Sequence, residues 1–515
     1  MLALLAAMFL VLSACGSDAV SDVGEAISDE DGAVSDEPQD ADTPDVDPTP
    51  GGTVVVAIPG DIDNFDPATN QLISAQYTIA NTVFNSLVGL DTELAVVSEL
   101  AEEFEANDDA SIFTFTLVQG ATFHDGSSVT SEAVVASLQR SAEIGGVIGG
   151  PLQRVTTFET PDERTLILTL DGPFAPFMST LASVSILAPA SFDTAATDPI
   201  GSGPFRFGSW TPNDKIVLER NDDYWGVKPA FDTLELRPIA DSQVALANLQ
   251  AGDVDIISEP SIAVVDQLDE NQATVVRPSS SNSIGYIEMM GTTDVLSDVR
   301  LRRAIAYAFD RETIREVAFG GVGDSVWSPL PTNSFAYDEQ EGYPFDLDLA
   351  AELVAEAGAD GTTIGIELLA GFPEAEQMAR VWQADLAKIG ISLDIRVSEV
   401  SVWLDRYVPR NYDMTWNFFG VSPDPSSFFD VLMAPHLGDR YPNPEMDELI
   451  AEAASISDTD ARAAIYAELQ VIMVEDLPIM TLQSRPIAGV VRNGVEGYAM
   501  NPLGWGLFDA VTLTE

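Results

Sequence analysis

The chain has 515 residues, more than the ~250–300 at which a single hydrophobic core stops growing, so we expect at least two packed lobes. Its hydrophobic content of 46% is ordinary, but 83 acidic residues against 23 basic ones give a formal net charge of -60. Such a field repels nucleic acid and anionic lipid, which both need clustered Lys and Arg, and therefore argues against those partners. The charge favours solubility in a salty exterior, with cation capture as the alternative.

The sequence begins with an apolar run that ends at a lone cysteine. Residues 2–12 are too few to span a ~30 Å hydrocarbon core, which needs about 20 residues, so they are typical of a secretory signal. No Lys or Arg precedes the run, so we expect Met1 to lie inside the true signal. Leu12-Ser13-Ala14-Cys15 resembles the bacterial lipoprotein cleavage box, which implies lipidation of Cys15. A free buried thiol is the alternative, and an intrachain disulfide is excluded because Cys15 is the only cysteine.

The segment 16–51 is rich in Ser, Asp, Glu, Pro and Ala and contains no aromatic residue. It cannot bury enough apolar surface to offset its ordering entropy, so we predict disorder. Its like charges extend it into a tether between the membrane and the folded body. No later stretch reaches 18 consecutive apolar residues, so we expect the lipid to be the only membrane attachment.

The first regular elements follow this tether. A β-branched run at 53–58 predicts a buried strand, and apolar residues at i+4 spacing predict a helix over 76–88. Alternating residues predict half-buried strands at 113–117 and 164–170, with a helix capped by Thr130 between them. Strands and helices mix here without strict alternation, which predicts an α+β region with largely antiparallel pairing.

Beyond about residue 290, helix and strand follow one another in turn. This order predicts parallel pairing through right-handed crossovers, and hence a separate α/β lobe. Pro478 ends the helical pattern, and we expect the last apolar segment to return to the first lobe. No flexible linker is visible within 52–515, so the crevice between two broadly touching lobes is the expected ligand site. The expected helices cover 297–309, 310–320, 349–357 and 373–388, with two more around Leu449 and Leu469, and the expected strands cover 363–369, 392–400 and 412–419.

Few residues offer catalytic or metal chemistry. His124 and His436 lie far apart in the sequence and lack the HExxH spacing, so each is predicted to be structural or exposed. The serine-hydrolase elbow, the phosphate-binding glycine loop and the EF-hand calcium loop are all missing from the sequence. We therefore predict no cofactor. A secreted hydrolase that uses two acidic residues is the enzymatic alternative, because carboxylates are plentiful.

Six motifs in order along the chain resemble those of extracellular solute-binding protein family 5, the oligopeptide, dipeptide and nickel receptors of ABC importers. The similarity covers essentially everything from about 52 to 510, and the six motifs together are far more specific than any one alone. The lipoprotein box agrees with it independently. The motifs are NFDPATN (64–70), FTFTLVQGATFHDGSSVTSEAVVASLQR (113–140), IGSGPFRFGSW (200–210), ERNDDYWGVKPAFDTLELRPI (219–239), DVRLRRAIAYAFDRETI (298–314) and SPDPSSFFDVL (422–432).

The resemblance implies an α/β, periplasmic-binding-protein-like, two-lobed fold (cluster C, type II) with an extra α+β subdomain in lobe I. The implied divisions are a signal peptide at 1–15, the tether at 16–51, lobe I at 52–285 with a subdomain at about 88–198, lobe II at 286–484, and a return to lobe I at 485–515.

The implied function is that of a substrate-binding lipoprotein without enzymatic activity. It would capture a small solute, peptide-like or other, by hinge closure of its lobes and deliver it to an ABC permease. We expect a monomer outside the cytoplasm, attached to the cell membrane by lipid alone, in the periplasm or at the cell surface. A surface sensor or adhesion protein on the same fold, without a permease partner, is a further alternative.

The resemblance places ligand contacts between Trp416 and Asp424. In the family an aromatic residue of this stretch covers the ligand, and Phe418 occupies that position, next to Phe419. Peptide-binding relatives commonly carry an Asp three residues before the Asp of the Asp-Pro pair, where it holds the peptide's α-amino group. The matching residue is Val421, which cannot pair with a buried ammonium ion. We therefore expect a less polar or uncharged solute.

Methionine and tryptophan side chains complete the predicted wall. The segment that ends in Met289 and Met290 has Met where many relatives have Asn, which exchanges a polar contact for an adaptable apolar one. A Trp inside a strand or helix packs in a core more often than it forms a ligand platform. Both uses therefore stay open for Trp327, Trp403 and Trp416.

Overall fold

The structure is a computed structural model that describes residues 51–69, 79–265, 267–269, 272–289, 293–370, 372–398, 400–407, 409–420, 422–433, 441–485 and 487–514. The predicted signal and most of the tether lie outside the described residues, as do Cys15, Met290, Val421 and His436. Within the described part of the chain, no helix has the length and apolar character needed to cross a membrane.

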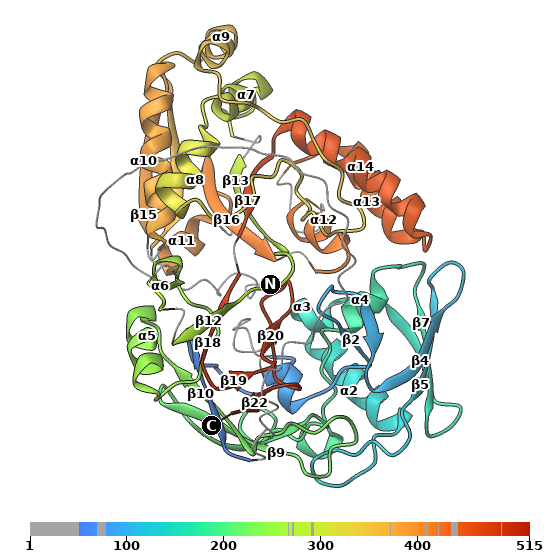
Figure 1. Ribbon diagram of the computed structural model, residues 1–515. Helices are drawn as coiled ribbons and strands as arrows, with labels where there is room; N and C mark the ends of the chain where they lie inside the picture. The colour runs from blue at the N-terminus through green and yellow to red at the C-terminus, as the bar shows by residue number, and fades with distance from the viewer. Residues whose placement is uncertain are drawn as a thin grey trace, which may run out of the picture.

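A seven-stranded sheet, low in Figure 1, forms the centre of lobe I, with the strand order β12-β18-β11-β1-β10-β9-β8. The central strand β1 is parallel to β10 and β11, and the other neighbours are antiparallel. Val54 and Val56 point into one core and Ala57 into another, because both faces of a central parallel strand are covered. The elements are β1 (Thr53–Ile58), β8 (Phe205–Thr211), β9 (Lys215–Arg220), β10 (Thr233–Pro238), α5 (Ser242–Ala251), β11 (Ile256–Ile257), α6 (Ile262–Val265), β12 (Ala273–Val276) and β18 (Gly489–Arg492).

A subdomain of lobe I is built on a four-stranded antiparallel sheet with the order β4-β5-β7-β6. Helix α2 begins where the sequence predicted, since Oγ1 of Thr130 accepts from the Ala133 amide at 3.2 Å. Its elements are β2 (Val88–Leu90), β3 (Val96–Ser98), β4 (Ala101–Ala106), β5 (Ile112–Leu117), α2 (Ser131–Ile144), α3 (Gly146–Gly149), η1 (Pro151–Arg154), β6 (Val155–Glu159), β7 (Thr165–Leu170), α4 (Phe177–Leu181) and η2 (Pro189–Ser191).

The helix predicted over 76–88 is wrong at its end. Residues 79–83 are helical, but β2 has begun by residue 88. The Ser86 amide donates to Glu99 at 2.9 Å, and the Ser86 carbonyl accepts from the Leu100 amide at 3.1 Å. These tertiary bonds replace the helical ones, and Leu87 is buried as part of the new turn rather than on a helix face.

A five-stranded sheet with the order β15-β14-β16-β13-β17 forms the centre of lobe II, high in Figure 1. The predicted parallel pairing is confirmed for β14 with β15 and β16, but β13 is antiparallel to β16 and β17. Every residue of β13 is buried, since cores lie on both faces. The elements are β13 (Ser283–Met289), α7 (Val299–Tyr307), α8 (Arg311–Phe319), α9 (Leu347–Ala357), β14 (Thr363–Leu369), α10 (Pro373–Lys388), β15 (Ser392–Ser398), α11 (Val400–Tyr407), β16 (Met414–Gly420), α12 (Ser426–Leu432), α13 (Pro444–Ser455), α14 (Thr459–Asp476) and β17 (Ile479–Ser484).

Helix boundaries in lobe II follow the sequence closely. The predicted bounds of α10 and β14 are confirmed to the residue. Asp310 caps α8, accepting from the Thr313 amide at 3.1 Å, and Gly320 ends it with a left-handed backbone. The preceding helix α7 is capped by Asp298, one residue after the Ser297 that the sequence suggested.

The chain crosses between the two sheets twice, from β12 to β13 and from β17 to β18. The crossings lie side by side, because the Arg485 amide donates to the Ser283 carbonyl at 2.7 Å. After the second crossing, β18 lies in the first sheet between β11 and β12. Short strands follow: β19 (Val495–Glu496), β20 (Ala499–Met500), β21 (Gly506–Leu507) and β22 (Thr512–Leu513).

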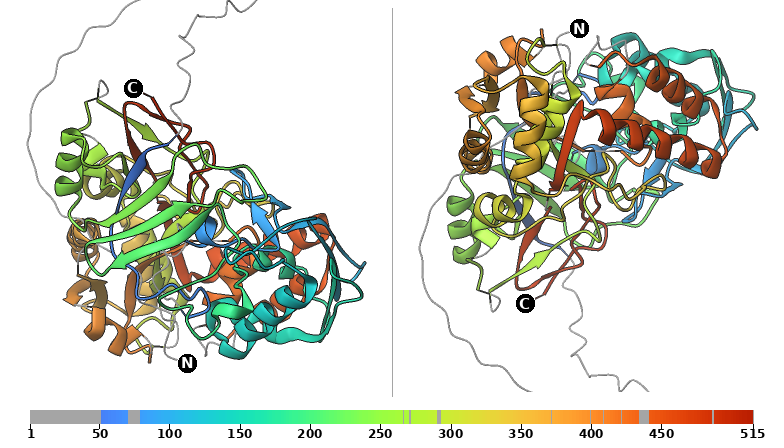
Figure 2. Two further views of the ribbon diagram at one scale, coloured as in Figure 1. Left: turned by 90° about the horizontal axis from the view of Figure 1, so that it is seen from below. Right: turned by 90° about the horizontal axis from the view of Figure 1, so that it is seen from above.

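The lobes also touch at a rim formed by the subdomain and α13, which Figure 2 shows from above as teal and red ribbons side by side. The Ala175 amide donates to the Ala454 carbonyl at 2.9 Å, and Ala454 packs against the apolar core of the subdomain. The Ser457 hydroxyl donates to the Asp108 carbonyl. The two lobes are thus joined both at the crossings and at this rim.

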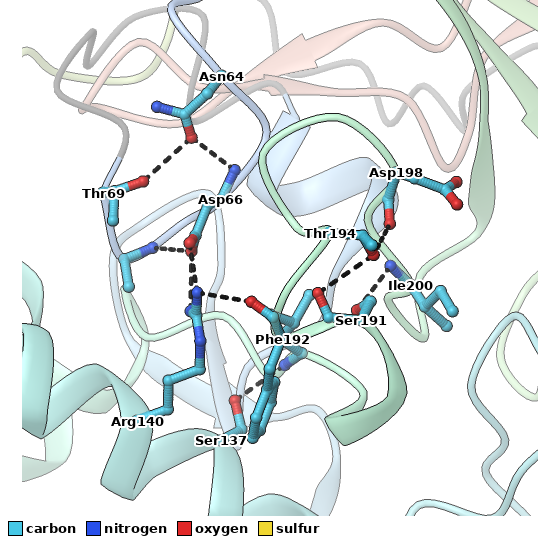
Figure 3. Close-up of polar contacts among 12 residues, drawn as sticks. Asn64, Asp66, Thr69, Ser137, Arg140, Ser191, Phe192, Thr194, Asp198 and Ile200 are labelled. Atoms are coloured by element: carbon cyan, nitrogen blue, oxygen red, sulfur yellow. Dashed lines mark hydrogen bonds and ion pairs between the residues drawn. The ribbon is translucent and has the colours of Figure 1, made fainter.

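An ion pair ties the subdomain to the first motif of the chain. Arg140 on α2 donates to both carboxylate oxygens of Asp66 and to the Phe192 carbonyl (Figure 3). The Asp66 side chain is mostly buried, and a two-pronged guanidinium–carboxylate pair fixes orientation as well as distance. The subdomain is therefore held rigidly on lobe I.

A second junction contains a carboxyl group that is half-buried. Glu99 accepts from Nδ2 of Asn85 at 2.7 Å and from the Ser86 amide at 2.9 Å. Burial raises the pKa of Glu99 to about 7, although both hydrogen bonds oppose the rise. This junction changes charge near neutral pH.

Candidate solute-binding site

The end of β16 and the second crossing place an arginine on an aromatic ring. Cζ of Arg485 lies 4.4 Å from the ring centroid of Phe418, and both side chains are half-buried. Phe418 also contacts Trp416 and Phe372, with ring centroids 5.9 and 6.1 Å away. An aromatic face backed by further rings holds a guanidinium in one plane.

The positive charge of Arg485 affects the pKa of one carboxyl group from each lobe. Glu259 follows β11 in lobe I, and Glu374 lies in the first turn of α10 in lobe II. Burial raises the pKa of both carboxyls, and the positive charge of Arg485 partly offsets that rise. Charged groups from both lobes, Arg485, Glu259 and Glu374, therefore interact next to the second crossing.

The charged groups of Arg485 and Glu259 are not paired with other side chains of the described chain. Among the described residues, the guanidinium of Arg485 makes no ion pair and no hydrogen bond, and the Glu259 carboxyl accepts none. Two further polar atoms are buried and have no hydrogen-bond partner among the described residues: the indole Nε1 of Trp416 and the phenol oxygen of Tyr498. Burial raises the pKa of Tyr498, and the negative charge of Glu259 raises it further. Arg485 and Glu259 thus keep hydrogen-bonding capacity to offer a solute, whereas the two ring donors are enclosed in the cores of the lobes.

The remaining predicted residues of β16 and the following turn point elsewhere. Phe419 lies on the opposite face of the strand, where its ring packs on Phe428 at 6.0 Å, because successive side chains of a strand alternate. Asp424 is buried in an ion pair with Arg462 at 2.7 Å and also accepts from the Ser426 amide. Its carboxylate is already engaged within lobe II.

Three further predicted residues lie in or against the large core of lobe II. Trp403 stacks on Tyr407 with centroids 4.3 Å apart, and Met289 is 1% exposed. Trp327 packs against this core under the guanidinium of Arg311, 3.3 Å from its ring. The structure therefore places Phe418 against Arg485. Trp416 contacts Phe418 but, like these three residues, belongs to or packs against the core of lobe II. Ligand contact at each of these positions stays a prediction.

Sequence reasoning missed Arg485, Glu259 and Glu374. The only signal was scarcity: the chain has 23 basic residues, and one of them directly follows a strand that ends at a crossing. A carboxylate among 83 acidic residues carries no such signal. Their convergence depends on the pairing of distant strands, which spacing in the sequence does not reveal.

Metal chemistry finds no support in the part of the chain that the structure describes. No three His, Cys, Asp or Glu side chains there are grouped so that they could hold a metal ion. Nε2 of His124 lies 3.1 Å from the Gly203 carbonyl, and burial lowers the pKa of His124 to about 4. His124 is therefore a neutral, structural histidine, as the sequence predicted.

Residues 95–436 match the family described as bacterial extracellular solute-binding proteins, family 5 Middle. The chain belongs to this family. The dipeptide-binding protein of Escherichia coli (strain K12) is 28% identical over 510 residues, covering 90% of this chain and 94% of that protein. The heme-binding protein A of Haemophilus influenzae is 28% identical over 459 residues, covering 80% of this chain and 83% of that protein.

Solved structures agree with the two-lobed fold of this family 5 protein. A periplasmic binding protein, DppA from Helicobacter pylori in complex with the peptide STSA, has a TM-score of 0.77 at 25% identity, covering 91% of this chain and 99% of that one. The substrate-binding protein CtaP from Listeria monocytogenes reaches 0.83 at 23% identity, covering 90% and 100%. The function of the chain is accordingly solute binding outside the cytoplasm, which the six sequence motifs had predicted.

Proposed function

We propose that this protein is the solute receptor of an ABC importer and that it binds without chemically changing its solute. The observation that carries the proposal is the unpaired Arg485 over Phe418, acting on a carboxyl from each lobe. Groups that come from both lobes and keep free hydrogen-bonding capacity suit a ligand that is enclosed between them. The permease partner rests on relatives such as the ABC transporter-associated DppA.

The proposed motion is a hinge at the two crossings. We divide the chain into lobe I (52–285, with its subdomain at about 88–198), lobe II (286–484) and the return segment (485–515). A solute stabilises the closed form only through contacts that the open form lacks. The rim contact between Ala175 and Ala454 is a contact of the closed form in this scheme.

The finer features of the proposal come from the sequence. Cys15 is the lipid attachment site, residues 16–51 are the tether, and the receptor works as a monomer. Relatives are named for dipeptides, glutathione and heme, and the similar protein AgaA was solved in complex with agropinic acid, so the fold accommodates varied solutes. The solute of this chain is a small molecule, peptide-like or other.

Calorimetry and thermal unfolding of the purified chain test this function. Panels of peptides, opines, sugars and osmolytes are the probes, together with any compound that mass spectrometry finds in the purified protein. A ligand at 100 times its Kd adds about 2.7 kcal/mol to the free energy of unfolding. The bound compound should be recovered intact. Turnover into a product would support the hydrolase alternative, and no response to any panel or growth medium would contradict the receptor.

A further inference from the structure

Arg485, the first residue of the return segment, differs from the buried or half-buried arginines of lobe II in having no structural task. Arg302 donates to the carbonyls of Leu296, Ser297 and Asp476, and Arg462 pairs with Asp424. Arg311 also stacks on a tryptophan, but it donates to backbone carbonyls, among them that of Leu482. The guanidinium of Arg485 stacks on Phe418 and makes no hydrogen bond to the described part of the chain.

The guanidinium of Arg485 reaches solvent when no solute is bound, because none of its nitrogens is among the fully buried atoms without a partner. A solute that covers it must supply an acceptor. Withdrawing such a charge from water without a partner is costly, whereas a two-pronged pair with a carboxylate restores the lost hydrogen bonds. Stacking on Phe418 leaves the edge of the guanidinium plane, which carries its N–H donors, free to meet that partner. Binding then requires little reordering of the side chain.

The two nearby carboxyls restrict which anion fits. The positive charge of Arg485 lowers the pKa of both Glu259 and Glu374, against the rise that burial causes, and the whole chain carries a formal net charge of -60. A phosphate dianion would meet two like charges for one guanidinium. A monoanion that also carries an N–H or O–H donor would satisfy Arg485 and a glutamate together.

We propose that Arg485 is the residue that binds a carboxylate of the transported solute, above the ring of Phe418. Glu259 and Glu374 exclude dianions and accept from a donor group beside that carboxylate. This inference rests on the proposed receptor function and narrows its substrate class to carboxylates. It replaces the less polar or uncharged solute that Val421 suggested.

The test compares the full chain with its Arg485→Gln, Arg485→Lys and Arg380→Gln variants. Arg380 is a matched control, because it lies on α10 with 67% of its side chain exposed. The probes are di- and tripeptides, N-acyl amino acids and opines, each as the free acid and as the uncharged amide, together with inorganic phosphate. Affinities come from calorimetry, and thermal unfolding without ligand verifies that each variant folds.

The wild-type chain should bind a free acid at least about 30-fold more tightly than its amide, since truncating a desolvated ion pair costs that much or more. Arg485→Gln should remove this preference, Arg485→Lys should keep part of it, and Arg380→Gln should keep all of it. Phosphate should not compete.

Three results would overturn the assignment while leaving the receptor function intact: equal binding of acid and amide, full affinity in Arg485→Gln, or an equal loss in Arg380→Gln. Absence of binding to any probe, with no molecule co-purifying, would overturn the receptor function and the assignment together.

Discussion

Arg462 and Asp424 form a buried ion pair at 2.7 Å, with 6% and 8% of their side chains exposed. Replacing Asp424 by Asn leaves a buried guanidinium without its counter-charge, so we expect the free energy of unfolding to fall by about 3 kcal/mol. Urea denaturation measures this loss. Solute affinity should stay unchanged, because the carboxylate is already occupied within lobe II.

The control for this change is Asp171→Asn. Asp171 pairs with Arg154 at 3.0 Å, but its side chain is 54% exposed, so the loss should be below about 1 kcal/mol. A large loss of affinity in a stably folded Asp424→Asn variant would instead support the ligand contact that the sequence suggested for Asp424.

Phe418 and Phe419 offer a matched pair of substitutions on opposite faces of β16. Phe418→Ala removes the surface on which Arg485 stacks, so we expect about a tenfold loss of solute affinity. Phe419→Ala should instead lower stability, since its ring packs on Phe428 in the core behind the strand. Calorimetry and thermal unfolding separate the two effects. Equal affinity in both variants would mean that β16 does not form the binding wall.

The half-buried Glu99 predicts a pH dependence of stability. Its pKa is about 7 in the folded chain against an ordinary 4.5, so between these values the folded state binds more protons than the unfolded state. Stability should therefore fall by roughly 1–3 kcal/mol as pH rises from 4.5 to above 7. Urea denaturation at pH 5, 6, 7 and 8 measures the slope.

Glu99→Gln should remove most of this slope, and Glu143→Gln, an exposed change on α2, should preserve it. An unchanged slope in Glu99→Gln would assign the pH dependence to other groups. Because Glu99 joins the subdomain to the body of lobe I, the loss should begin at that junction, which hydrogen exchange can localise.

The rim contact gives a prediction about closure. Ala454→Asp places a carboxylate against the apolar core of the subdomain, so we expect the closed form to be disfavoured. Affinity should fall about tenfold with little change in stability, because this contact joins two lobes that are each folded already. Small-angle scattering with ligand should show a more open particle. Ala451→Asp, exposed on the same helix, is the control, and equal effects of both changes would contradict a role for the rim.

Local pattern was enough to predict most elements of lobe II, because capping residues and apolar periodicity agree there with the tertiary structure. Asp310 and Gly320 bound α8, and Pro373 begins α10. The helix expected over 76–88 failed because hydrogen bonds from Ser86 to distant residues outweighed a local i+4 pattern. Strand direction also escaped prediction, since β13 and β17 join the parallel strands from far away in the sequence.

The candidate site was only half predictable. The motif around Phe418 could be located by its resemblance to the family, and in the structure the ring of Trp416 contacts that of Phe418 from the core side. Trp327, Trp403 and Met289 are as apolar as ligand-binding residues, and composition alone does not separate a core position from a cleft position. Arg485 became visible only when the crossings placed it on Phe418 without an internal partner.

The position of β18 governs the order in which the chain can fold. This strand lies inside the first sheet, between β11 and β12, yet it comes from the last part of the sequence. During synthesis, the sheet that begins with β1 is incomplete until β18 has been made. The strands of lobe II are contiguous in the sequence and are all made before β18. Lobe II can therefore complete its sheet before lobe I does, although lobe I begins first in the sequence.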